Sequence, residues 1–240
     1  MSIASDGAQP EPASSRKVGS RAFLIDLALY LPVMFLIREI YFDRLGFMGN
    51  GLFWSFSGLA VATWRMRARG ITWAEIGLRK PDDIKRVLIT SMVILGMAIG
   101  SIIIFEILKD RFAWNLSPDT SSESAVSKFG NLENNWLLFF SIIPIIWLES
   151  FLEEVLDRGF MMNWIERMFG STLLATVLAV VLQAIIFGFR HSNDFSERSI
   201  TVGLIGLAMG VGYVVFGRNL WPLILAHCVL NTVSMLNRVG

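Results

Sequence analysis

The sequence predicts an all-α polytopic membrane protein, a bundle of about seven transmembrane helices, from three observations. Of its 240 residues, 54% are hydrophobic and only 17% are charged, whereas soluble domains carry about 25% charged residues. The charged residues lie between long apolar runs instead of alternating with them. These runs are too continuous for barrel strands, and only helices or closed barrels satisfy the backbone in lipid. A helical bundle follows.

Seven apolar runs approach the length that a membrane span needs, which is roughly 20 residues for a hydrocarbon core of about 30 Å. The first of them is short and contains Asp26 and Pro32. Between the spans, residues 70–86 are expected to form an interfacial helix or loop, and residues 109–135 the longest loop. The predicted spans are residues 22–37, 46–64, 87–108, 136–152, 172–189, 200–216 and 220–236.

The distribution of Lys and Arg predicts the orientation. The densest basic cluster lies in residues 65–86, on the same side of the seven spans as the N-terminus, and basic loops stay in the cytoplasm. We therefore expect an integral protein of a bacterial inner membrane with a cytoplasmic N-terminus. Residues 1–20 lack the apolar core of a secretory signal and are expected to be a disordered tail before a single transmembrane domain, residues 21–240. The formal charge of +1 gives no reason to expect a nucleic-acid partner, and the oligomeric state stays open.

Ionisable residues next to or within membrane spans are costly and mark functional sites by default. Glu153 and Glu154 directly follow the fourth apolar run, and Arg158 lies four residues after Glu154. That spacing favours an ion pair between Glu154 and Arg158 on one helix face. Adjacent helical residues diverge by about 100°, so Glu153 points elsewhere and is the candidate reactive carboxylate. Alternatively, the two glutamates simply meet water where a helix ends.

The two histidines of the chain, His191 and His227, both lie in or beside apolar runs. His227 and Asn231 are four residues apart, so they share a helix face and can donate hydrogen bonds to one point. Glu153 and His191 lie at nearly equal distances from Gly170, the expected turn of a helical hairpin, which lets them face one another. The alternative for each histidine is a polar contact to a neighbouring helix.

Three motifs in this order resemble the signature of the CAAX protease and bacteriocin-processing family, which includes the type II CAAX prenyl endopeptidases. They are Glu153-Glu154-x-x-x-Arg158, Phe187-x-x-x-His191 and His227-x-x-x-Asn231. The segment from Trp73 to Leu78 also resembles the family, but more weakly. Three ordered motifs that use both histidines are far more specific than one. Asp157, before the arginine, and Arg190, before His191, depart from the family pattern, and Asp157 could compete with Glu154 for Arg158.

The resemblance implies an intramembrane endopeptidase with a polar chamber inside the bundle and a catalytic core at about residues 136–237. Its substrate would be a membrane-associated peptide or protein. Glu153 would activate a water molecule that His191 helps to hold. His227 and Asn231 would stabilise the oxyanion, and Glu154 and Arg158 would support the site.

A metal is not favoured, because Asn231 suits an oxyanion role better than a zinc shell. If zinc takes part, Glu153, His191 and His227 would be its three ligands. Two other functions stay open. One is a non-catalytic bacteriocin-immunity or scaffolding protein of the same fold, and the other is a small proton-coupled transporter, in which buried Glu and His also occur.

Overall fold

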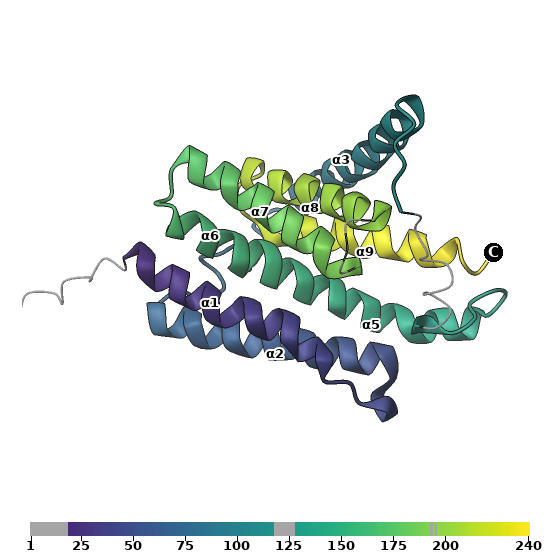
Figure 1. Ribbon diagram of the computed structural model, residues 1–240, viewed down its shortest axis with the longest axis horizontal. Coiled ribbons are helices and arrows are strands. Elements are labelled where there is room, and N and C mark those ends of the chain that lie inside the picture. The colour runs from purple at the N-terminus through teal and green to yellow at the C-terminus, as the bar shows by residue number, and fades with distance from the viewer. Residues whose placement is uncertain (1–18, 118–127, 193, 195) are drawn as a thin grey trace, which may run out of the picture.

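The computed structural model describes residues 19–117, 128–192, 194 and 196–240, and in these ranges it contains helices and connecting segments but no strand. The predicted all-helical bundle is confirmed (Figure 1). Nearly all of the predicted tail, and residues 118–127 of the predicted longest loop, lie outside the described residues. The elements are α1 (Ser20–Leu36), η1 (Ile37–Glu39), η2 (Asp43–Leu45), α2 (Gly46–Arg69), α3 (Ile84–Arg111), α5 (Trp136–Glu154), η3 (Val155–Met162), α6 (Asn163–Met168), α7 (Leu173–Ser192), α8 (Glu197–Val215) and α9 (Leu220–Leu236).

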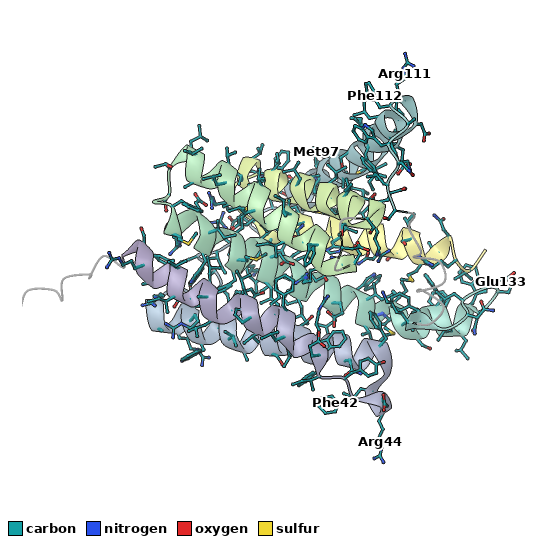
Figure 2. All side chains as sticks on the ribbon, viewed as in Figure 1. Phe42, Arg44, Met97, Arg111, Phe112 and Glu133 are labelled. Atoms are coloured by element: carbon teal, nitrogen blue, oxygen red, sulfur yellow. The ribbon has the colours of Figure 1, made fainter. Side chains whose placement is uncertain are left out.

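In the part of the chain that the structure describes, six continuous helical segments are long and apolar enough to cross a membrane, and the 17-residue α9 completes the predicted seven. Their outer surfaces are apolar, with Leu137, Leu173 and Met92 more than 70% exposed, while Asp26, Glu154 and Arg158 are fully buried. Figure 2 shows side chains projecting outward along the whole length of the bundle. Apolar exteriors over buried charges suit a lipid surrounding, and the chain is an integral membrane protein.

The central element is longer than the sequence predicts. Helix α5 does not end near residue 152 but continues through the π-helical segment η3 and α6 to Met168, 33 residues in all. All eight residues of η3 are buried, and Asn163 donates from Nδ2 to the carbonyls of Arg158 (3.1 Å) and Gly159 (2.7 Å), which the π geometry frees. Glu153 therefore lies about 26 Å from Trp136 and about 22 Å from Met168, near mid-helix.

Helices α1, α2, α7, α8 and α9 pack around this central one, and α3 packs against α8 and α9 (Figure 1). Helices α1 and α2 lie together on one side, and α7, α8 and α9 cover the other. Helix α7 returns along α6 after the turn at Gly170, whose φ of +93° is the left-handed conformation expected there. Helices α7 and α8 cross so closely at Gly188 that a Cβ would collide with the Ser199 carbonyl, the kind of close approach that small residues allow in membranes. Of the predicted interfacial segment, residues 70–86, the part before residue 84 forms turns and bends, and residues 84–86 begin α3.

Asp26, which interrupts the first apolar run, joins three helices. Its carboxylate accepts hydrogen bonds from Arg65 Nε (2.8 Å), from Arg69 Nε and Nη2 (both 2.8 Å), and from Trp164 Nε1 (3.0 Å). These partners belong to α2 and α6. Because every partner is a donor, the buried negative charge is compensated, and a charged residue is tolerated inside a membrane span.

Replacing Asp26 by Leu should destabilise the protein by about 3 kcal/mol, because it leaves two partly buried arginines and the Trp164 N–H without an acceptor. We expect a lower apparent Tm in detergent. The control is Asp82→Asn, an exposed acid in a connecting segment, which should keep the wild-type Tm. Equal melting of Asp26→Leu and wild type would contradict this role.

Candidate functional site

The two adjacent glutamates at the end of α5 lie in different surroundings, as their angular separation predicts. The Glu154 side chain is fully buried, whereas the Glu153 side chain retains 18% exposure. Neither meets bulk water at a helix end, because the helix continues beyond both. The alternative of an interfacial glutamate pair is therefore wrong. Glu153 combines burial with access, which a reactive carboxylate needs.

Glu154 connects α5 to α9 through one oxygen. Its Oε1 accepts from Arg158 Nη1 at 2.9 Å, the expected i,i+4 ion pair, and from His227 Nδ1 at 2.7 Å. Arg158 is itself fully buried, donates to the Gly206 carbonyl at 3.4 Å and lies 4.4 Å from the Phe187 ring centre. Glu154 thereby fixes the His227 ring in addition to bracing Arg158. The contact between Glu154 and His227 was not predicted from the sequence.

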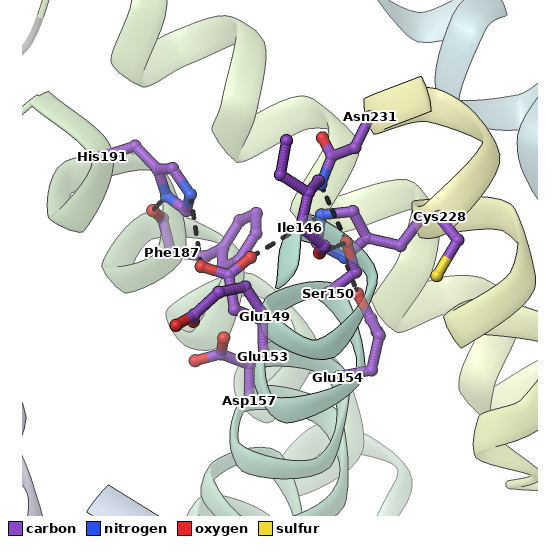
Figure 3. Close-up of polar contacts among 12 residues, drawn as sticks. Ile146, Glu149, Ser150, Glu153, Glu154, Asp157, Phe187, His191, Cys228 and Asn231 are labelled. Atoms are coloured by element: carbon purple, nitrogen blue, oxygen red, sulfur yellow. Dashed lines mark hydrogen bonds and ion pairs between the residues drawn. The ribbon is translucent and has the colours of Figure 1, made fainter. Parts of the chain in front are cut away.

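The histidines flank Glu153, one at each carboxylate oxygen, and Figure 3 shows His191 beside Glu153. His191 Nε2 lies 3.6 Å from Oε1, and His227 Nε2 lies 3.6 Å from Oε2. His191 Nδ1 is 2.7 Å from the Phe187 carbonyl, which can only accept, so Nδ1 carries a proton. His227 Nδ1 donates to Glu154 in the same way. Both rings therefore turn Nε2 toward Glu153.

Asn231 lies one helical turn beyond His227, and its side chain contacts a second residue of α5. Its Nδ2 donates to Ser150 Oγ at 2.9 Å, and the Ser150 hydroxyl donates to the Ile146 carbonyl. An amide NH₂ carries two donors, so this contact positions Asn231 and leaves one N–H uncommitted. The structure thus gathers all six predicted residues around the junction of α5, α7 and α9.

Asp157 and Arg190, the two departures from the family pattern, bind one another. Arg190 Nη2 lies 2.8 Å from Asp157 Oδ2 and 3.3 Å from Glu153 Oε1. The expected competition of Asp157 for Arg158 is therefore wrong, since Asp157 faces α7 while Arg158 faces Glu154. Arg190 also adds a cation beside Glu153 that the sequence interpretation had not assigned to the site.

Two further residues beside the site were missed. Glu149 lies one turn before Glu153 on α5, as the labelled side chains in Figure 3 show, and accepts from Ser55 Oγ of α2 at 2.7 Å. Arg38 of η1 donates to the Arg190 carbonyl at 2.6 Å. The spacing of Glu149, Glu153 and Asp157 at successive turns was visible in the sequence. Nothing local signalled Arg38.

The conditional zinc set was Glu153, His191 and His227. Among the residues that the structure describes, no group of three or more His, Cys, Asp or Glu side chains is placed to hold a metal ion. The two imidazoles face different oxygens of the Glu153 carboxylate. The conditional zinc set stays a prediction, and we derive no step through a metal.

Comparison with known proteins identifies one family. Residues 134–233 match the family described as "Type II CAAX prenyl endopeptidase Rce1-like". The matched segment contains Glu153, Glu154, Arg158, His191, His227 and Asn231. No curated protein and no solved structure shows a significant match to this chain.

The contact between Asp157 and Arg190 predicts a thermodynamic coupling. Asp157→Asn and Arg190→Met should each destabilise the protein by about 3 kcal/mol, because each leaves a buried opposite charge without its partner. The double variant should lose at least 1 kcal/mol less than the sum, roughly the interaction energy of contacting residues. Unfolding in detergent measures all four proteins, and strictly additive losses would exclude the coupling.

Proposed function

We propose, from the match of residues 134–233 to the family described as type II CAAX prenyl endopeptidase Rce1-like, that this chain is an intramembrane endopeptidase. It hydrolyses a peptide bond in a membrane-associated peptide or protein. The observation that carries the proposal is the Glu153 carboxylate, held with two imidazole Nε2 atoms at 3.6 Å inside a membrane helix bundle.

Glu153 acts as the general base. Its oxygens lie slightly too far from both Nε2 atoms for direct hydrogen bonds, and such a distance suits a shared water molecule. A water held by Glu153 and His191 gives one proton to the carboxylate as its oxygen attacks the carbonyl carbon of the substrate. General bases contribute about 10²- to 10⁴-fold to rate. When the C–N bond breaks, Glu153 returns the proton to the leaving nitrogen.

His227 and Asn231 stabilise the charge that develops on the carbonyl oxygen. Asn231 has an N–H beyond the one given to Ser150, and a doubly protonated His227 ring can donate from Nε2. Glu154 at Nδ1 compensates the positive charge of that ring, as an acidic residue does beside a catalytic histidine. Glu154 and Arg158 are thus positioning residues that act through His227.

The proposed setting is a cell membrane with the N-terminus in the cytoplasm. Arg65 and Arg69 of the basic segment, residues 65–86, bind Asp26 and the Ala22 carbonyl near the start of α1, and basic clusters of this kind stay cytoplasmic. With α9 as the seventh crossing, the C-terminus lies outside. Glu153, near the middle of the central helix, would then meet substrates within the membrane rather than in bulk water.

Replacing Glu153 should abolish proteolysis while leaving the protein folded. Glu153→Gln keeps the size of the side chain but removes the base, so we expect a rate loss of at least about 100-fold. Quantitative proteomics of membrane-protein termini, comparing cells with wild type and Glu153→Gln, should reveal termini that vanish in the variant. Glu133→Gln, an exposed acid just before the segment that matches the family, is the matched control.

If the set of termini is the same in both strains, or a phenotype of the wild type survives in folded Glu153→Gln, the function is not proteolysis. A non-catalytic role of the same fold would then take its place. Proton-coupled uptake into liposomes without peptide cleavage would instead identify a transporter.

We also propose that hydrolysis needs no metal, since Glu153 and the two histidines can activate water themselves. Activity of the purified protein should survive dialysis against EDTA, and elemental analysis of active protein should find less than one zinc per chain. Loss of activity on chelation, restored by added zinc, would overturn the metal-free mechanism but leave the peptidase assignment intact.

A further inference from the structure

The charges around Glu153 do not all find partners within the protein. Glu154 pairs with Arg158, and Asp157 pairs with Arg190, which also approaches Glu153. One guanidinium is left over. Arg38 has no carboxylate within 4 Å among the described residues, although it lies within electrostatic range of Glu149, Glu153 and Asp157.

Arg38 is nevertheless held firmly. It lies in η1, where the chain leaves α1, and its Nη1 donates to the Arg190 carbonyl at 2.6 Å. Its guanidinium lies 5.7 Å from the centre of the Trp54 ring, and Trp54 Nε1 is fixed in turn by the Ile40 carbonyl at 2.9 Å. A guanidinium has five N–H donors, and only one of them is given to a protein acceptor that the structure describes. The side chain is half-buried, so its remaining donors stay accessible.

Glu149, one of the three acids within electrostatic range of Arg38, is engaged elsewhere. Its Oε2 accepts from Ser55, and its Oε1 is buried against α2, where a Cβ on Gly51 would lie 3.3 Å away. Arg38 thus carries a half-buried cation at the end of the first span, with no carboxylate within 4 Å among the described residues, and a buried charge without a partner is costly. Such a group is typical of a site that a ligand completes, because arginine forms strong two-pronged hydrogen bonds with carboxylates.

We propose that Arg38 binds a carboxylate of the peptide substrate and thereby selects substrates with an anionic group close to the scissile bond. The carbonyl that holds Arg38 belongs to the residue before His191, so the bound carboxylate lies beside the catalytic imidazole. That carboxylate is either the C-terminal one or that of an Asp or Glu side chain. The inference rests on the proposed function and names Arg38 as a specificity-determining residue of the same site.

The test uses a pool of synthetic peptides without Asp or Glu, with and without an S-farnesyl group, in three matched forms. The first form has a free C-terminal carboxylate, the second a C-terminal amide, and the third an amide with one added Asp. Purified wild type should cleave one of the two acidic forms with a kcat/KM about 10- to 100-fold above that of the neutral amide, the range expected for a charge-assisted hydrogen bond. The preferred form identifies the source of the carboxylate.

Arg38→Met should lose this preference, chiefly through a higher KM for the acidic form, so that its kcat/KM values for the acidic and neutral forms converge. An apparent Tm in detergent close to that of wild type shows that the variant is folded. Arg38→Lys keeps the positive charge but loses the two-pronged geometry of the guanidinium. Its preference for the acidic form should lie between that of wild type and that of Arg38→Met. Arg44→Met is the matched control, because Arg44 is exposed and projects away from the bundle (Figure 2), and it should keep the full preference.

Equal cleavage of all three forms by wild type would overturn the inference and leave the endopeptidase assignment standing. Retention of the preference in Arg38→Met would also overturn the inference. So would an equal loss of cleavage of the acidic and neutral forms, because Arg38 would then have only a structural role. If Glu153→Gln and wild type behave alike toward every peptide, the proposed function fails, and the role of Arg38 fails with it.

Discussion

The bond between Glu154 Oε1 and His227 Nδ1 holds the site together. The same oxygen receives Arg158, so a single buried carboxylate atom connects the central helix to α9 and, through Arg158, to the Gly206 carbonyl of α8. In an apolar interior each of these charges would be costly alone. Their mutual satisfaction fixes the His227 ring and keeps a proton on its Nδ1, and this leaves Nε2 facing Glu153. Without Glu154, the position of His227 would depend on apolar packing alone.

Much of this could be predicted from the sequence, because membrane helices impose a simple geometry. The spacing of Glu154 and Arg158 predicted their ion pair. The near-equal distances of Glu153 and His191 from Gly170 predicted that the two side chains face one another across a helical hairpin. Both inferences need only helical periodicity and one turn. The alternation of apolar runs with basic clusters was enough to predict the bundle and its number of helices.

The rest depended on contacts between distant residues. The end of the central helix was misplaced because the apolar run stops at residue 152, whereas the helix continues where its polar residues find partners on other elements. Asp157 and Arg190 were each noticed as departures, yet nothing local links two residues on different helices. Arg38 followed an apolar run as an ordinary flanking charge would, and only the fold brings it to Arg190.

The distribution of partners also explains which acid in this region is reactive. The π-helical segment is enclosed on all sides, so its charged residues are committed to partners: Asp157 to α7, and Arg158 to Glu154 and α8. Glu149 is engaged by Ser55 of α2. Glu153 alone among these acids retains exposure on a face that two imidazoles share, and its nearest cation, Arg190, is already bound more closely to Asp157. Catalysis requires a carboxylate that is oriented but not neutralised, and the neighbouring ion pairs leave Glu153 in that state.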